Sequence, residues 1–148
     1  MCSLFYVETH HKKVCFHTSK SCVTTLFPTV ILFDNGAMIL IVEDNCQVRK
    51  MIRSLIEDFD EDICECEDGA EALDAFQKHR PQWVLMDLGM RRMNGLDATR
   101  QIINAFPDAK IAIVTNHDDT NMRLAATSAG ACAYIVKENL IDLRRLFA

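Results

Sequence analysis

The sequence lacks several features that would place it in a special class of protein. Its formal net charge is −5, so it has no general electrostatic attraction to nucleic acid or to anionic membranes. It contains no internal repeat and no low-complexity linker. Its 148 residues, of which 49% are hydrophobic and 25% charged, therefore fit one soluble globular domain of common size.

The cysteines show no disulfide pattern. Seven are present, an odd number without regular spacing, so we expect reduced thiols in a cytoplasmic protein and no disulfide framework. A zinc site would have to combine Cys64 and Cys66 with residues near the N-terminus, namely His10, His11, Cys15, His17 and Cys22. Their spacing matches no zinc motif that we can identify, and we expect free thiols instead.

The chain also lacks an apolar run long enough to span a bilayer. Residues 22–33 (CVTTLFPTVILF) follow three lysines and resemble the start of a signal peptide. The run is shorter than the roughly 20 residues of a membrane helix, contains Pro28, and is not followed by a small-residue cleavage site after Asp34. We expect neither export nor membrane insertion.

Short apolar runs alternate with amphipathic segments from residue 38 onward. Strands are expected at residues 38–42, 62–66, 83–86, 110–114 and 133–136. Helices are expected after the first strand and at residues 69–79, 96–106, 118–128 and 138–147. This alternation predicts an α/β fold, a doubly wound five-stranded parallel sheet with helices on both faces.

The first and last helices carry several apolar residues. Those of the first lie on one helical stripe, which consists of Val48, Met51, Ile52, Leu55, Ile56 and Phe59. The last helix carries Leu140, Ile141, Leu143 and Leu146.

Residues 1–37 fall outside the alternation. Asn35-Gly36 between apolar runs is a hairpin signal, but residues 38–42 cannot pair in a hairpin if both edges of that strand are taken in a parallel sheet. We therefore expect an N-terminal extension at residues 1–37 and a folded domain at residues 38–148. Because Met38 opens the first strand, the extension could reflect a start codon assigned too early.

Four of the five expected strands end in residues that can do chemistry. These are Glu43-Asp44, Asp87, Thr115 and Lys137, and the carboxyl ends of such strands lie on one rim where ligands bind. Three carboxylates together repel one another, and a hard divalent cation such as Mg²⁺ relieves the repulsion. A lysine ammonium and a threonine hydroxyl suit a phosphoryl group at that metal. The pattern predicts a phosphoryl-transfer site.

These residues resemble the receiver domains of two-component response regulators. The similarity covers about residues 38–148 and rests on four ordered segments, ILIVEDN (39–45), VLMDLGMRRMNGLDA (84–98), IAIVTN (111–116) and AGACAYIVK (129–137). The resemblance implies the flavodoxin-like (βα)5 receiver fold with strand order 2-1-3-4-5. It also implies a phosphoprotein that signals through contacts with other proteins.

The resemblance assigns the acidic residues to phosphoryl transfer. Asp87 would accept the phosphoryl group from a sensor histidine kinase or a phosphotransfer protein. Glu43 and Asp44 would bind Mg²⁺ together with Asp87, and the backbone carbonyl of Gly89 would be a further ligand.

Three other residues would transmit the signal. Thr115 and Lys137 would contact the phosphoryl group, and Tyr134 would change rotamer when Thr115 moves. A downstream protein would then bind the face formed by the fourth helix, the fifth strand and the fifth helix. No direct binding to nucleic acid is expected, because no output domain follows in this chain.

The chain departs from the usual receiver pattern at four positions. Arg91 and Ala133 stand where the family usually has Pro and Gly, and Asn116 stands where a very small residue is usual. Glu138 follows Lys137 in place of the usual Pro. The last variant resembles receivers that are attached to helix-turn-helix output domains.

Several alternatives stay open at this point. The chain could be the receiver fragment of a helix-turn-helix transcriptional regulator, or an interaction module that acts without phosphorylation. A Mg²⁺-dependent phosphohydrolase would need a second acid two residues after its nucleophile, where this chain has Gly89. A flavin-binding module would need a loop rich in glycine and hydroxyls after the first strand, and residues 45–49 are not one. Enzymatic activity beyond self-phosphorylation and self-dephosphorylation is not expected.

Overall fold

The structure is a computed structural model that describes residues 6–9, 12–15, 38–59 and 62–147. The chain divides into two units, Met1–Asn35 and Gly36–Ala148. In the first unit, β1 (Tyr6–Thr9) pairs antiparallel with β2 (Lys12–Cys15). The sequence did not predict this hairpin, because its strands lie outside the alternation of apolar runs. The turn signal at residues 34–36 lies outside the described residues.

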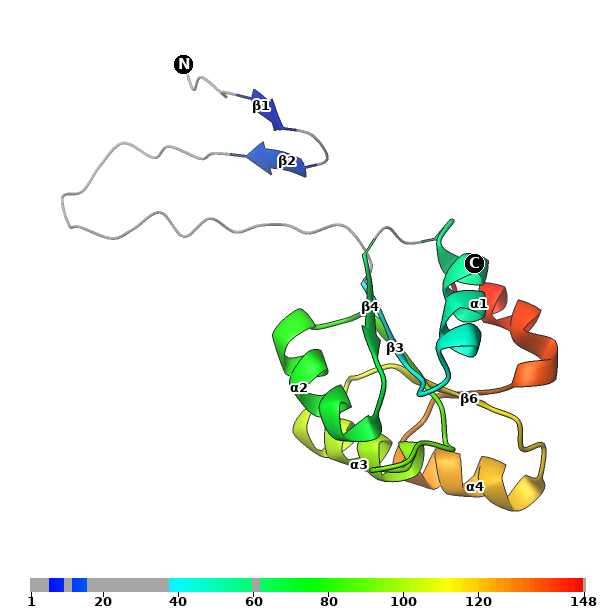
Figure 1. The fold of residues 1–148 in the computed structure, drawn as a ribbon. Helices are drawn as coiled ribbons and strands as arrows, with labels where there is room; N and C mark the ends of the chain where they lie inside the picture. The colour runs from blue at the N-terminus through cyan, green and yellow to red at the C-terminus, as the bar shows by residue number, and fades with distance from the viewer. Residues whose placement is uncertain (1–5, 10–11, 16–37, 60–61, 148) are drawn as a thin grey trace. The chain divides into compact units, whose positions relative to one another are not determined.

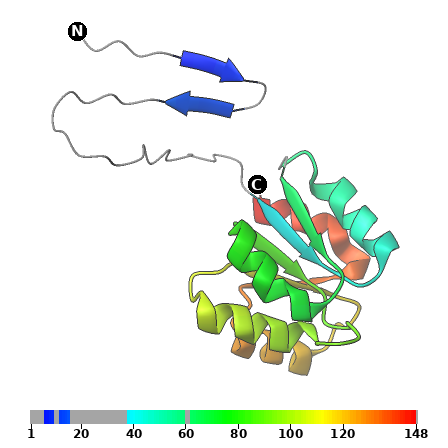
Figure 2. The same cartoon turned by 60° about the vertical axis from the view of Figure 1, so that its left-hand side comes forward.

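The second unit contains a five-stranded parallel sheet (Figures 1 and 2). Its strands are β3 (Ile39–Val42), β4 (Ile63–Cys66), β5 (Trp83–Met86), β6 (Ile111–Thr115) and β7 (Ala133–Val136). They lie in the order β4-β3-β5-β6-β7, which confirms the predicted fold and the strand order 2-1-3-4-5. All five predicted strands are present, with bounds within one residue of those expected.

Helices cover both faces of the sheet. They are α1 (Cys46–Ile56), α2 (Gly69–His79), α3 (Gly95–Ala105), α4 (Thr120–Ala129), the 3-10 helix η1 (Lys137–Leu143) and α5 (Arg144–Phe147). One core lies between the sheet and α2, α3 and α4, and the other between the sheet and α1, η1 and α5 (Figure 1). Because β3 and β6 are covered on both faces, every one of their residues is buried.

Side-chain caps fix where the first four helices of the second unit begin. The capping residues are Asn45, Asp68, Asn94 and Asp119, whose side chains accept hydrogen bonds from backbone N–H groups of the first helical turn. Each cap satisfies an amide that the helix itself cannot pair. Since each helix follows a strand, the caps hold the strand-to-helix loops at the carboxyl rim of the sheet.

The predicted stripe of the first helix is wrong at two positions. Met51 is 55% exposed and Phe59 is 36% exposed. The buried positions are Arg49, Ile52 and Ile56, which centres the buried face away from Met51 at 3.6 residues per turn. Phe59 lies beyond the end of α1, where its ring packs against Phe147 at 5.9 Å.

The last predicted helix is also different in the structure. Residues 138–147 do not form one α-helix, because η1 covers Lys137–Leu143 and Asn139 has non-helical backbone angles within it. With about three residues per turn, Leu140 and Leu143 both point into the core. Ile141, between them, is 61% exposed.

Within the described ranges, every helix falls short of the length and apolar character that a membrane-spanning helix needs.

We propose that residues 1–37 are dispensable to the domain at residues 38–148. A protein that begins at Met38 should unfold with a free energy within about 0.5 kcal/mol of that of the full chain, as expected when no packed contacts are lost. Chemical denaturation of both proteins measures the difference. A loss of more than about 2 kcal/mol would mean that the removed segment packs on the domain.

Candidate functional site

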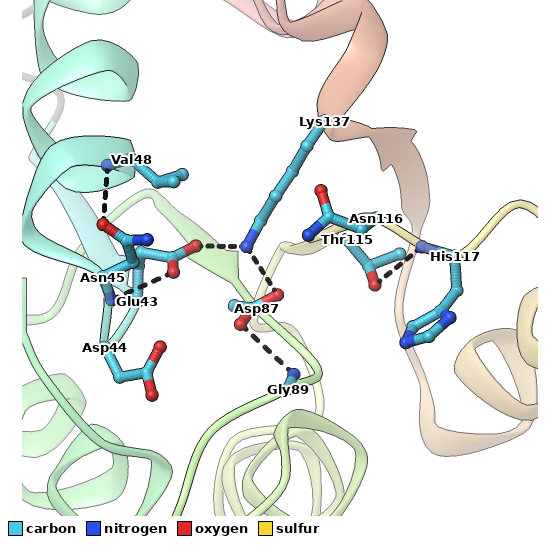
Figure 3. Close-up of a pocket in the computed structure, with 10 residues that line it drawn as sticks. All are labelled: Glu43, Asp44, Asn45, Val48, Asp87, Gly89, Thr115, Asn116, His117 and Lys137. Atoms are coloured by element: carbon cyan, nitrogen blue, oxygen red, sulfur yellow. Dashed lines mark hydrogen bonds and ion pairs between the residues drawn. The ribbon is translucent and has the colours of Figure 1, made fainter.

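A pocket opens where the carboxyl ends of β3, β5, β6 and β7 meet (Figure 3). We call it the rim pocket; its lining residues are Glu43, Asp44, Asn45, Val48, Asp87, Gly89, Thr115, Asn116, His117 and Lys137. Six of the seven sequence-predicted site residues line it. The seventh, Tyr134, does not.

The three predicted carboxylates converge in the rim pocket. One oxygen each from Glu43, Asp44 and Asp87 lies within 4.8 Å of the others. Glu43 is 1% exposed and Asp87 is 5% exposed. The Asp87 N–H donates to the Val42 carbonyl at 2.9 Å, so the pairing of β5 with β3 fixes the positions of these carboxylates relative to each other.

Lys137 is the buried cation that contacts two of these carboxylates. Its Nζ lies 2.6 Å from Glu43 Oε2 and 3.0 Å from Asp87 Oδ1 (Figure 3). Burial alone would lower the pKa of Lys137, but the contacts with Glu43 and Asp87 together outweigh it and raise the pKa. The ammonium is therefore charged at neutral pH.

Glu43 is the most buried of the carboxylates. Its burial raises its pKa, although the hydrogen bond from Lys137 opposes the shift. The Asn45 N–H donates to Oε1 at 3.1 Å, and Oε2 faces the ammonium. The Lys137 ammonium and the exposed Arg91 guanidinium, 3.8 Å from Asp44 Oδ2, leave the three carboxylates with a net negative charge. Three such carboxylates fit a hard divalent cation, which prefers oxygen ligands.

The loop after β5 is held by hydrogen bonds to two carboxylates, Asp87 and Asp68. The Gly89 N–H donates to Asp87 Oδ2 at 3.2 Å, and the buried Asp68 accepts from the Arg92 N–H at 3.0 Å while it caps α2. At Gly95, a Cβ atom would lie 1.9 Å from the Asp87 carbonyl oxygen. Only glycine allows this approach.

Thr115 and Tyr134 are connected through one residue of the loop after β6. Thr115 is buried, and its Oγ1 accepts from the His117 N–H at 3.3 Å. The Tyr134 hydroxyl donates to the His117 carbonyl at 2.7 Å. The Arg123 guanidinium of α4 lies 4.6 Å from the Tyr134 ring centre. A movement of the loop would therefore reach both Tyr134 and α4.

Sequence reasoning missed the role of Arg49. This residue of α1 is 7% exposed, and its guanidinium donates to the Glu43 carbonyl at 2.6 Å. Its spacing of three and seven residues from Ile52 and Ile56 was the available signal, because it places an arginine on the buried stripe. A buried arginine needs partners, and Glu65 was the alternating polar residue of the neighbouring strand.

The described residues give no second group that could hold a metal ion. Cys64 and Cys66 are free thiols, and burial raises the pKa of Cys66 to about 11. The thiol of Cys66 is therefore protonated at neutral pH and a poor ligand. The other residues considered for zinc are His10, His11, His17 and Cys22, which lie outside the described residues, and Cys15, whose backbone alone is described.

Comparisons with known proteins agree with this geometry. The response regulator receiver domain family matches residues 39–148. The chemotaxis protein CheY of Thermotoga maritima is 34% identical over 103 residues, which cover 69% of this chain and 86% of CheY. Transcriptional regulatory protein DegU of Brevibacillus brevis is 32% identical over 107 residues, which cover 71% of this chain and 45% of DegU.

A solved structure extends the similarity to the fold. A two-component response regulator of the LuxR family from Aurantimonas sp. superimposes with a TM-score of 0.70 at 32% identity, over 75% of this chain and 81% of that chain. The chain spans about half the length of DegU and of an uncharacterized transcriptional regulatory protein of Bacillus subtilis, of which it covers 45% and 53%. The family match at residues 39–148 and the shared fold lead to the same conclusion. The chain belongs to the response regulator receiver domain family of two-component signal transduction.

Proposed function

We propose that this receiver accepts a phosphoryl group on Asp87 from a sensor histidine kinase or a phosphotransfer protein, in the cytoplasm. The observation that carries the proposal is the arrangement of the rim pocket. A nearly buried aspartate has two further carboxylates within 4.8 Å and an ammonium group 3.0 Å from its Oδ1. Such a set positions and neutralises charge, which is what phosphoryl transfer requires of a protein.

Glu43, Asp44, Asp87 and the Gly89 carbonyl would hold Mg²⁺. The fit is supported by the raised pKa of Glu43, since burial disfavours its charge and a nearby cation would restore it. The bound ion would supply positive charge to the oxygens of the phosphoryl group.

The protein's own residues would carry out the transfer. An oxygen of Asp87 forms a bond to phosphorus as the bond between phosphorus and the donor imidazole nitrogen breaks. The nitrogen keeps the electron pair and takes up a proton. Lys137, already beside Oδ1, stays close to the new phosphoryl oxygens, and the Thr115 hydroxyl turns toward them. Gly89 at the second position after Asp87 leaves no acid to hydrolyse a phosphate ester, so the proposed role is signalling.

The output surface would be the face formed by α4, β7, η1 and α5. Turning Thr115 toward the phosphoryl group breaks its bond from the His117 N–H and moves the loop that Tyr134 holds through its hydroxyl. This biases a two-state surface through differential contacts. Leu124 of α4 and Ile141 of η1, each 61% exposed, would contact a downstream protein.

A second candidate is the receiver of a DNA-binding transcriptional regulator. The observation that favours it is length, since the chain covers 45% of DegU, which is named a transcriptional regulatory protein. In that case the same output face would contact an output domain, and the rim pocket would work in the same way. An interaction module that acts without phosphorylation would retain the face but not the phosphoryl chemistry.

Replacing the acceptor tests the proposal. Wild-type protein with Mg²⁺ and acetyl phosphate should become phosphorylated, and Asp87→Asn should abolish the modification, because an amide oxygen is a poor nucleophile. Asp74→Asn, at an exposed position of α2, is the control and should react like the wild type. Gel mobility on a phosphate-affinity matrix reads the result. A modification that survives in Asp87→Asn would place the acceptor elsewhere.

Lys137→Ala should separate phosphorylation from the response. Without the ammonium beside Asp87 and Glu43, the protein should still be phosphorylated with Mg²⁺. Amide hydrogen exchange of α4 and β7 should then stay as it is in the unphosphorylated protein. Lys78→Ala, exposed on α2, should keep the full response. Exchange that changes in Lys137→Ala as in the wild type would contradict the role given to this residue.

The lifetime of the phosphoryl group should depend on Asn116. Water must attack phosphorus opposite the Asp87 oxygen, and Asn116 and His117 line the pocket where water approaches. Misalignment of an attacking group can cost on the order of 100-fold in rate. Asn116→Ala should therefore speed the decay by up to about 100-fold with Mg²⁺ affinity unchanged. Asn121→Ala on α4 is the control, and an unchanged or slower decay in Asn116→Ala would refute the idea.

A further inference from the structure

The buried guanidinium of Arg49 joins three parts of the domain. Nη1 donates to the Glu43 carbonyl at 2.6 Å, Nε donates to Glu65 Oε2 at 3.3 Å, and Nη2 donates to Glu67 Oε1 at 2.7 Å. Its side chain is 9% exposed. A planar guanidinium can serve three acceptors at once in a fixed geometry, which a lysine cannot do.

The carbonyl that Arg49 holds belongs to the peptide between two proposed metal ligands, Glu43 and Asp44. This peptide leaves β3 and has not yet entered α1, so no strand or helix partner serves its oxygen among the described hydrogen bonds. The Glu43 N–H is fixed separately, by donation to the Cys66 carbonyl at 3.1 Å. Rotation about this peptide would move the Asp44 side chain relative to Asp87. The Arg49 contact therefore restrains rotation of the peptide that leads to Asp44.

We propose that Arg49 is a positioning residue that orients Asp44 for the divalent cation by holding the Glu43 carbonyl. Glu65 and Glu67 balance its charge and fix the guanidinium plane. This inference rests on the proposed function of the rim pocket. It adds a residue that touches neither the cation nor the phosphoryl group, and acts only through the backbone of a ligand.

The direction of the change in cation affinity on loss of Arg49 distinguishes a positioning role from a simple electrostatic effect. Loss of a positive charge beside a cation site should tighten cation binding, because Coulomb repulsion is removed. Loss of a contact that orients a ligand should weaken cation binding. Removal of such supporting contacts typically costs about 10- to 100-fold in metal affinity. The two explanations therefore predict changes in opposite directions.

Arg53 provides a matched control on the same helix. It also pairs with Glu65, at 2.8 Å, but its side chain is 46% exposed. Among the described contacts, its guanidinium bonds to Glu65 and to no loop carbonyl. Arg53→Gln thus removes an equal charge and a second ion pair of Glu65 without touching the Glu43 peptide.

The experiment is a calorimetric titration of Mg²⁺ into the full chain at one ionic strength. Arg49→Gln should weaken Mg²⁺ binding at least about ten-fold, whereas Arg53→Gln should stay within about two-fold of the wild type or bind slightly more tightly. The rate of phosphorylation by acetyl phosphate should fall in Arg49→Gln at low Mg²⁺ and recover at saturating Mg²⁺. A defect of general folding would not be rescued in this way.

Other outcomes overturn the inference. If Arg49→Gln binds Mg²⁺ as tightly as the wild type or more tightly, Arg49 does not position the site. If Arg49→Gln does not fold, Arg49→Lys is the deciding variant, because it keeps the charge but offers a single nitrogen. Unchanged Mg²⁺ affinity in Arg49→Lys would refute the inference. A loss of affinity of several-fold would support it. A wild-type protein that does not bind Mg²⁺ would remove the proposed function and this inference with it.

Discussion

Repulsion among three carboxylates at one rim of the sheet is the constraint on which the structure depends. Oxygens of Glu43, Asp44 and Asp87 lie within 4.8 Å of one another, and Lys137 supplies the ammonium that contacts two of them. Burial of like charges opposes folding. The surrounding domain must therefore supply enough stability to keep these groups together, and backbone contacts that prevent them from moving apart.

The stability comes from the apolar sheet that ends at the rim. β3 and β6 are buried along their whole length between two cores, and burial of large aliphatic side chains contributes about 1.5–3 kcal/mol each. The contacts come from the loops, where the Val42 carbonyl pairs with the Asp87 N–H and Arg49 holds the Glu43 carbonyl. The apolar strands thus supply the stability, and the polar loops the contacts, that keep the three carboxylates in place.

The sequence was sufficient to predict most of the fold and six of the ten residues that line the rim pocket. Apolar runs of strand length that end in Glu43, Asp87, Thr115 and Lys137 place these side chains at one rim, because parallel strands share a direction. The spacing of apolar residues and the turn signals are local features of the sequence, so they predicted the helices and strands well. They failed where contacts between distant parts of the chain decide which side chains are buried. Met51 is exposed because α1 packs on the sheet through Arg49 and Ile52.

The same limit explains the other differences. Whether residues 138–147 form an α-helix or a 3-10 helix depends on how Leu140 and Leu143 fit the core, which composition does not reveal. Arg49 drew no prediction from the sequence, since arginine is rarely buried without partners. Its partners Glu65 and Glu67 come from a different strand-to-helix unit, and only the paired sheet brings them together.

The most direct measurement is to identify the phosphorylated residue in the unaltered protein. The protein is treated with acetyl phosphate and Mg²⁺ and then with borohydride, which reduces an acyl phosphate to an alcohol and leaves free carboxylates unchanged. Peptide mass spectrometry then locates the reduced side chain. Reduction is expected at Asp87 alone, and none is expected when Mg²⁺ is omitted. Reduction at Asp44, at Glu43 or at an exposed carboxylate, or no reduction at all, would contradict it.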